Sequence, residues 1–292
     1  MTGRLRPLWT PGGGRGSGRP PGVPKLVSPQ PANAAVWFED FVGITVAPVV
    51  FGEGTVADPA TVLNQVAYGH PAWIIKAIAG TGTAGQGGMS QNFFGTLQLV
   101  PSSASGDGLI ADLGGRTTTS ATCSMFGVSN SSVMMSRCAL SGGLTLRNDA
   151  WGWPATSIAQ GTDWFTDPDT TLAATNSIVI TRHIASYSGD AAGDLVGRLY
   201  ESSGVDTDSV VLLTSAQVTT ISSGGIKVEV QCTGGNLNFY INDVLAGTID
   251  IPNVAANSIV RPSFGNRTTG VAANRVLNMD CFYSEVGLTT AR

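Results

Sequence analysis

The chain has 292 residues, of which 42% are hydrophobic and only 12% charged, and its formal net charge is −4. That apolar fraction is enough for a core, which excludes a disordered chain, and no apolar run approaches the roughly 18 residues that a membrane-spanning helix needs. Glycine is abundant, with 38 residues, while lysine and glutamate are rare, so the composition favours β-sheets joined by tight turns.

Residues 1–34 differ sharply in charge from the rest of the chain. They hold five basic residues and no acidic one, whereas residues 35–292 hold eleven basic and twenty acidic residues. Runs such as Pro11-Gly12-Gly13-Gly14 are extended and pliable, so this segment cannot bury a core of its own. We expect a basic docking arm that binds a protein surface. The residues expected to make its contacts are Arg4, Leu5, Arg6, Leu8, Trp9, Arg15, Arg19, Lys25 and Leu26. Nucleic acid is the weaker alternative, because five scattered charges without interleaved aromatic side chains make a poor binding groove.

The body is expected to span residues 35–292. Its first strand is predicted at 36–41, and a short helix at 60–66, after the N-cap and N1 signal Asp58-Pro59. A strand follows at 73–78, and from residue 93 onward we find only β signals.

The segment after that strand matches a nucleotide-binding pattern, Gly80-x-Gly82-x-x-Gly85. A dinucleotide site needs a helix to open directly behind the glycines, and Gln86-Gly87-Gly88 is a very poor helix start. We therefore predict a flexible loop here and no nucleotide cofactor.

The last third shows the clearest strand alternation. Residues 226–232 alternate apolar and polar side chains, with Glu229 on the face predicted to be wet. Residues 237–249 form a hairpin around Asn242-Asp243, in which Ile241 should face Val244 and Phe239 should face Ala246. A late strand is predicted at 276–286. The pattern indicates an antiparallel meander.

The run from Gly235 to Thr248, Gly-Asn-Leu-Asn-Phe-Tyr-Ile-Asn-Asp-Val-Leu-Ala-Gly-Thr, resembles the hairpin of concanavalin A-like (laminin G-like) jelly rolls. The resemblance extends over about residues 175–288. It implies an antiparallel jelly-roll β-sandwich and supports a fold more than a function. Bodies of that family occur as lectins, as glucanases, and as domains of bacteriophage capsid-decoration and tail proteins.

A Lys-poor, Gly/Ser/Thr-rich body behind an extended arm looks most like the bacteriophage group. The expected role is that of a capsid decoration (cement) protein in the virion, present in the host cytoplasm during assembly. Its expected partners are other virion proteins, above all the major capsid protein, and further copies of itself, with a trimer favoured. The alternatives are a tail or fibre component, or a lectin-like protein that binds host glycans.

Catalytic patterns are not found. Glucanases of this fold carry an E-x-D-x-x-E strand, and the five glutamates of this chain are scattered. His70 and His183 have no nucleophile pattern near them and are interpreted as ordinary loop or edge residues. We therefore expect no enzymatic activity and no cofactor.

No metal site is expected either. The cysteines at 123, 138, 232 and 281 lack C-x-x-C spacing and are interpreted as buried thiols. Aspartates gather at 163–169 and at 206–208 without a calcium-loop string, so turn formation explains them better than calcium binding.

Tryptophans make the most suggestive aromatic group. Trp151 and Trp153 stand in a Trp-Gly-Trp-Pro run, with Trp164 nearby. Three interpretations stay open: stacking on glycans, an interface with another subunit, or the sandwich core.

Overall fold

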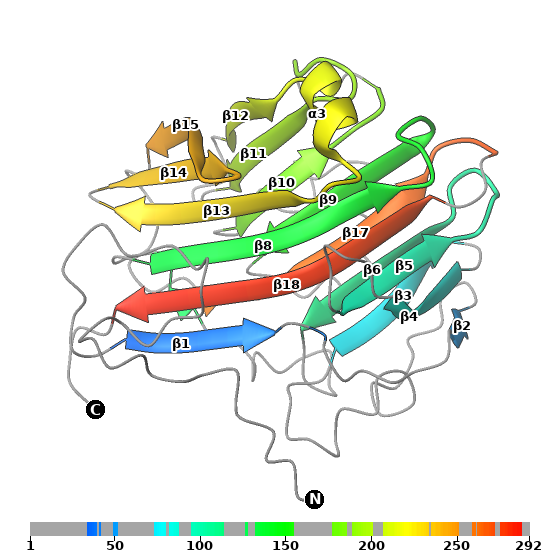
Figure 1. Cartoon of the computed structure of the whole chain (residues 1–292), viewed down its shortest axis with the longest axis horizontal. Coiled ribbons are helices and arrows are strands. Elements are labelled where there is room, and N and C mark those ends of the chain that lie inside the picture. The colour runs from blue at the N-terminus through cyan, green and yellow to red at the C-terminus, as the bar shows by residue number, and fades with distance from the viewer. Residues whose placement is uncertain are drawn as a thin grey trace, which may run out of the picture.

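The computed structural model describes residues 34–39, 41, 49–51, 73–79, 82–87, 95–113, 126–127, 132–154, 177–185, 189–200, 207–233, 235–250, 259–260, 262–271 and 275–287. Within these ranges the chain forms antiparallel β-sheets stacked as a sandwich, with one short helix (Figure 1). The predicted all-β, jelly-roll-type fold is confirmed. The predicted arm, up to residue 33, and the helix predicted at 60–66 lie outside the described residues.

The larger sheet, sheet A, has nine strands and faces the viewer in Figure 1. From one edge its order is β15 (Val244–Asp250), β14 (Asn236–Ile241), β13 (Ile226–Thr233), β8 (Ser132–Ser141), β18 (Val276–Gly287), β5 (Thr96–Pro101), β4 (Gly82–Gly87) and β2 (Val49–Phe51). The ninth strand, β1 (Ala34–Glu39), pairs with the later half of β18.

The second sheet, sheet B, has seven strands and lies behind sheet A. Its order is β12 (Thr207–Leu213), β11 (Leu195–Tyr200), β10 (Ser177–Arg182), β9 (Arg147–Trp153), β17 (Ser263–Thr268), β6 (Gly108–Leu113) and β3 (Trp73–Ala79). A separate small pair joins β16 (Ile259–Val260) to β7 (Phe126–Gly127).

The core fills the space between the sheets, because alternate residues of each strand point inward. Aromatic rings from both sheets meet there: Phe264 of β17 lies 5.9 Å from Phe282 of β18, and Trp153 of β9 packs edge-on against Phe282 at 6.0 Å, measured between ring centroids. Edge-to-face packing of this kind adds to the burial of the rings. Residues far apart in sequence therefore hold the two layers together.

The predicted strands at 226–232, 237–249 and 276–286 are confirmed as β13, β14, β15 and β18. Ile241 does face Val244, but Phe239 faces Gly247 and not Ala246. A β-bulge between Phe239 and Tyr240 shifts the register by one residue. A period-2 pattern carries no sign of such an inserted residue, so this part of the prediction is wrong.

A helix appears where only strands were predicted. Helix α3 (Ser215–Ile221) leads from β12 into β13, and its Thr214 amide donates to Oε1 of Gln217 at 2.8 Å. That bond satisfies an N–H at the helix start that has no partner within the helix.

The glycine-rich segment predicted to be a loop is strand β4 over Gly82–Gly87. A Cβ atom at Gly82 would lie 2.8 Å from the Leu109 side chain of β6. Here glycine permits the close approach of two strands, so the loop prediction is wrong.

Candidate functional site

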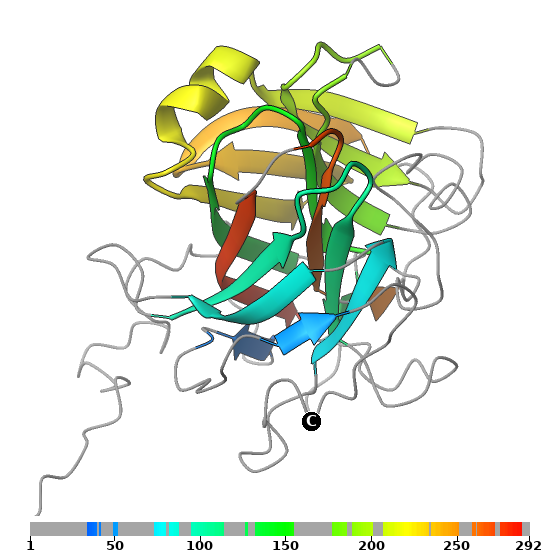
Figure 2. The same ribbon diagram turned by 90° about the vertical axis from the view of Figure 1, so that its right-hand side faces the viewer.

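Several connections meet at one end of the sandwich, where the loops after β5, β8 and β17 gather (Figure 2). Arg267 Nε donates to the Gly106 carbonyl at 2.9 Å, and Arg275 Nε donates to the Thr145 carbonyl at 2.8 Å. The Thr269 amide donates to the Leu146 carbonyl at 3.0 Å. Two arginine side chains and one backbone amide from the end of β17 and the loop before β18 thus hold the backbone of the loops after β5 and β8.

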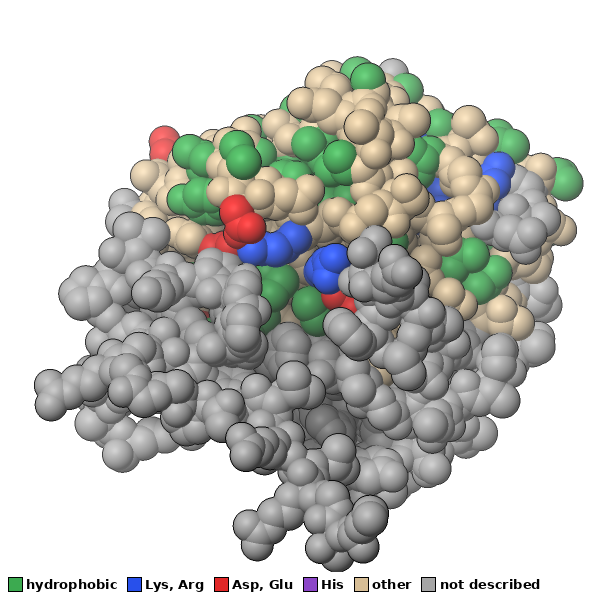
Figure 3. Space-filling model, in the orientation of Figure 1, with side chains coloured by type: hydrophobic (Ala, Val, Ile, Leu, Met, Phe, Trp, Pro, Cys, Tyr) green, Lys and Arg blue, Asp and Glu red, His purple; other side chains and the backbone are tan. Residues whose placement is uncertain are grey.

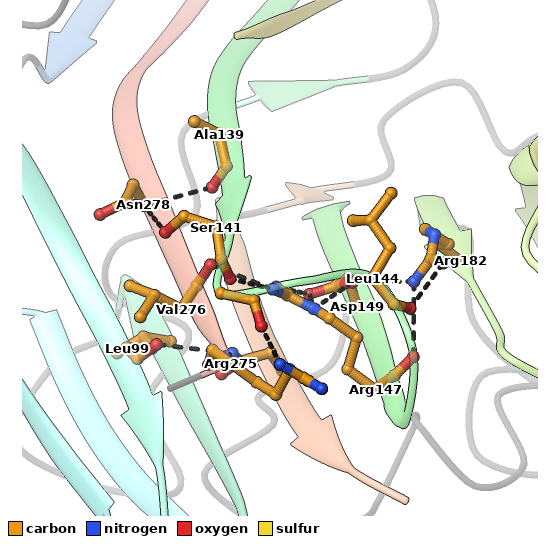
Figure 4. A network of polar contacts seen from close by, with 12 residues as sticks. Leu99, Ala139, Ser141, Leu144, Arg147, Asp149, Arg182, Arg275, Val276 and Asn278 are labelled. Atoms are coloured by element: carbon orange, nitrogen blue, oxygen red, sulfur yellow. Dashed lines mark hydrogen bonds and ion pairs between the residues drawn. The ribbon is translucent and has the colours of Figure 1, made fainter. Parts of the chain in front are cut away.

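A buried ion-pair cluster supports this end from inside (Figure 4). Nε of Arg147 donates to both carboxylate oxygens of Asp149, at 3.0 and 2.9 Å, and neither side chain reaches solvent. Nη1 of Arg147 donates to the Ser141 carbonyl at 2.9 Å and to the Val276 carbonyl at 3.2 Å. The cluster therefore joins β9 to the ends of β8 and β18.

A second guanidinium approaches the same carboxylate. Nη1 of Arg182 lies 3.6 Å from Oδ2 of Asp149, and Nη2 donates to the Leu144 carbonyl at 2.8 Å. Burial lowers the pKa of Arg182, while the Asp149 charge opposes that shift. Two buried cations share one carboxylate, so Asp149 is the residue on which this end depends most. Its burial makes the cluster structural, because no ligand can reach it.

A shallow cleft lies beside this end, on the outer face of sheet B, lined among others by Thr181, His183, Asp190, Asp194 and Arg198. Arg198 donates to the Asp190 carboxylate and, from Nε, to Oγ1 of Thr181 at 3.0 Å. Oδ1 of Asp194 accepts from the Ser215 amide at 2.7 Å. His183 was predicted to be an ordinary loop or edge residue, yet it is only 8% exposed and lines the cleft. The charged groups that line the cleft are thus bonded within the protein and mostly buried.

The two central tryptophans are core residues. Trp151 and Trp153 of β9 are both 0% exposed and belong to the main hydrophobic cluster. Neither ring presents a face to a glycan or to another subunit, so those two interpretations are corrected for this pair. Gly152 stands between them in strand β9. Its φ is +145°, and a Cβ there would lie 2.5 Å from the Ile178 carbonyl oxygen, so glycine is required inside the strand.

Other predicted site residues cannot be placed. Trp164 and the nine arm residues from Arg4 to Leu26 lie outside the described residues.

The outer face of sheet A carries two buried carboxylates that the alternation pattern did not predict. Glu229, predicted to be on a wet face, is 2% exposed and accepts from Nε2 of Gln231 at 2.6 Å. Glu285 is fully buried and accepts from the Tyr283 hydroxyl at 2.5 Å. The carboxylates come from β13 and β18, with β8 between them. The two strands therefore lie two strand spacings apart, about 9.6 Å.

An apolar surface lies at the edge of the sandwich where β15 ends sheet A and β12 ends sheet B. Val244 is 69% exposed, Leu245 is 55% exposed and Val211 of the adjoining strand β12 is 42% exposed. In the part of the chain that the structure describes, no strand pairs beyond β15 in sheet A or beyond β12 in sheet B. Figure 3 shows hydrophobic side chains among uncharged ones over β14, β15 and α3. We name this surface the edge patch and define it by Asp208, Val211, Asp243, Val244, Leu245 and Asp250.

Metal and thiol chemistry find little support within the described ranges. No three His, Cys, Asp or Glu side chains there gather closely enough to hold a metal ion. Cys138, Cys232 and Cys281 are buried thiols, as predicted, while Cys123 is not among the described residues. Burial raises the pKa of Cys138 well above its usual value and that of Cys232 to about 11, so neither forms a reactive thiolate at neutral pH. No described helix is long and apolar enough to cross a membrane.

Comparison with known proteins gives structural likeness only. No family model matches the chain, and no curated protein matches it. The carbohydrate recognition domain of Emp46p in its potassium-bound form is 10% identical, with a TM-score of 0.45, over 78% of this chain and 92% of that one. The CBM2 module of the Lactobacillus casei BL23 phage J-1 evolved Dit is 11% identical, with a TM-score of 0.42, over 88% of this chain and 98% of that one. A glycosyl hydrolase family protein from Mycobacterium fortuitum is 9% identical, with a TM-score of 0.46, over 85% of this chain and 98% of that one.

The chain spans 44% of the length of a botulinum neurotoxin binding domain that also matches. Likenesses this distant carry no argument about ligand or role. The fold assignment therefore depends on the strand order and register described above, and the edge patch is the candidate site.

Proposed function

We propose that this chain is a non-enzymatic structural protein of a bacteriophage virion, and most specifically a capsid decoration protein that binds the assembled shell through residues 1–34. The observation that carries the proposal is a charge-poor β-sandwich with exposed apolar side chains at its edge, combined with a terminal segment of five basic residues and no acidic one. Protein interfaces are depleted of charge at their centre and favour apolar contacts.

The proposed mechanism is mass action. A protein that binds the assembled lattice, and not its separate subunits, stabilises that lattice by an amount that grows with the logarithm of its concentration divided by its Kd. The positive charge of the arm attracts the protein to the shell, while the folded sandwich lies at the particle surface. The buried carboxylates of sheet A are bonded to their own neighbours, which agrees with a role without hydrolysis.

The test is reconstitution onto capsids that lack the protein, using the full chain. The charge-reversed variant R4E/R6E/R15E/R19E is compared with R4K/R6K/R15K/R19K, which keeps the charge and changes the side chain. The wild type and the lysine variant should decorate the shell. The glutamate variant should lose occupancy by about tenfold or more. Added salt should weaken the binding of the wild type in the same way, because it screens the charges of the arm. Equal occupancy for all three proteins would contradict the proposal.

A further inference from the structure

The edge patch is an uncovered surface where both sheets end. Strand β15 ends sheet A and strand β12 ends sheet B, and the two strands contact each other across the sandwich. Val210 of β12 packs against Gly247 of β15 so closely that a Cβ at Gly247 would lie 2.3 Å from it. Val244 and Leu245 are 69% and 55% exposed, so none of the described residues covers them. Apolar side chains beside two strand edges that no described strand pairs are typical of a surface that binds a partner.

The patch is acidic as well as apolar. Asp243 and Asp250 stand at the two ends of β15 and are exposed, and Asp208 at the start of β12 is half-buried. The nearest described cation is Lys227, whose Nζ is paired with the Asp243 carboxylate. The neighbouring helix α3 has the sequence Ser-Ala-Gln-Val-Thr-Thr-Ile and adds no charge. A partner for this surface therefore needs basic residues together with apolar anchors.

The N-terminal segment has that chemistry. It combines Arg4 and Arg6 with the apolar side chains of Leu5, Leu8 and Trp9, and it contains no acidic residue. The place where this segment joins the folded body also lets it reach such a patch. Strand β1 begins at Ala34 beside β18, and β14, β13 and β8 separate β18 from β15. From β1 to β15 there are five strand spacings, about 24 Å at 4.8 Å each, while 33 extended residues span roughly 100 Å.

We propose that the N-terminal segment, residues 1–33, of one copy docks on the edge patch of a second copy of this chain. The proposal deepens the proposed function and rests on its view of residues 1–34 as a docking arm, adding a partner for that arm within the assembly. Arm and patch are different surfaces, so the contact is head-to-tail. Repetition of such a contact closes into a ring when the rotation between copies allows it. The predicted trimer is one such ring.

A charge-swap experiment with full chains, without capsids, tests the proposal. The arm variant R4E/R6E/R15E/R19E has an acidic arm, and the patch variant Asp208→Lys/Asp250→Lys has a basic patch. Sedimentation velocity at 150 mM salt should show self-association of the wild type and a loss of about tenfold or more in affinity for each variant alone. An equimolar mixture of the two variants should associate again, because the acidic arm of one matches the basic patch of the other.

Apolar variants provide a second measurement. Leu245→Ser should weaken self-association, while Val271→Ser should leave it unchanged. Val271 is the matched control, because it is 82% exposed and lies in the turn that follows β17. Circular dichroism of every variant confirms that the strands have formed.

Three outcomes overturn the inference. They are a wild type that stays monomeric at high concentration, a mixture that fails to restore association, and a patch variant that loses association while the arm variant keeps it. The last result would show that two patches pair directly. Binding to capsids is measured in a separate experiment. If the mixed variants do not associate but the wild type still binds capsids, only this inference is refuted. A successful swap without decoration refutes only the capsid role.

Discussion

Asp149→Asn is the most informative single substitution for the stability of the sandwich. It keeps the shape of the side chain and removes the only carboxylate in contact with Arg147 and Arg182 among the described residues. The Asp149 side chain is fully buried, so water cannot replace the lost charge. Both guanidiniums would then remain inside the protein without an anion.

The magnitude follows from that burial. Removing one partner from a buried ion pair costs about 3–5 kcal/mol, because the other charge stays desolvated. Asparagine keeps one acceptor oxygen for Arg147, and both arginines keep their carbonyl partners, so we expect the lower end, about 3 kcal/mol. With an m-value of about 3 kcal/mol/M, the urea midpoint should fall by about 1 M.

Urea unfolding of the full chain, followed by tryptophan fluorescence, measures the change. The matched control is Asp280→Asn, which removes a carboxylate from a partly exposed pair with Arg137 and should cost about 0–1 kcal/mol. The double variant Arg147→Met/Asp149→Leu removes one charge of each sign and should cost less than Asp149→Asn alone. If Asp149→Asn costs no more than Asp280→Asn, the buried cluster does not stabilise this end as we reason.

Further predictions concern packing, pH and secondary structure. Gly152→Ala should destabilise the protein by about 3 kcal/mol or more and lower its melting temperature, because the added Cβ would meet a backbone oxygen at 2.5 Å. Gly224→Ala, where the nearest atom is 3.7 Å away, should change the melting temperature little. The pKa of Cys232 rises on folding, so its contribution is complete below its usual pKa near 9.0 and is lost as pH rises through about 11. The urea midpoint should therefore fall over that window, by less in Cys232→Ala, and a midpoint independent of pH there would contradict the burial. Circular dichroism should show strand signal with less than about a fifth helix.

Local sequence patterns predicted the strands in which apolar and polar residues alternate clearly, which are β13, β14, β15 and β18. The hairpin of β14 and β15 has a two-residue turn in which Asn242 and Asp243 adopt positive φ of 47° and 71°, as its turn residues indicated. The alternation in β13 indicated a strand correctly but not its surroundings. Glu229 and Gln231 are buried, because both faces of that part of sheet A are covered, and one strand's own pattern does not show what lies over it.

Helix α3 was missed for a different reason. Val218, Thr219, Thr220 and Ile221 are β-branched and favour strands by propensity. The Thr214-x-x-Gln217 spacing that caps the helix was present in the sequence and could have predicted it. The candidate sites were harder still. The cleft and the ion-pair cluster combine residues from separate strands, whose pairing depends on long-range packing that no local window contains.

Strand β18 has a bearing on how the protein is made. It pairs with β8, β5 and β1, and its residues 282–287 hold residues 34–39 at the other end of the chain. Synthesis must therefore proceed through residue 287 before the middle of sheet A can close. Until then β8 lacks a neighbour on one side and several strand edges are exposed together. Such a chain folds after translation and slowly, because its pairings span great sequence distances. During that interval it depends on low concentration or on a chaperone to avoid aggregation.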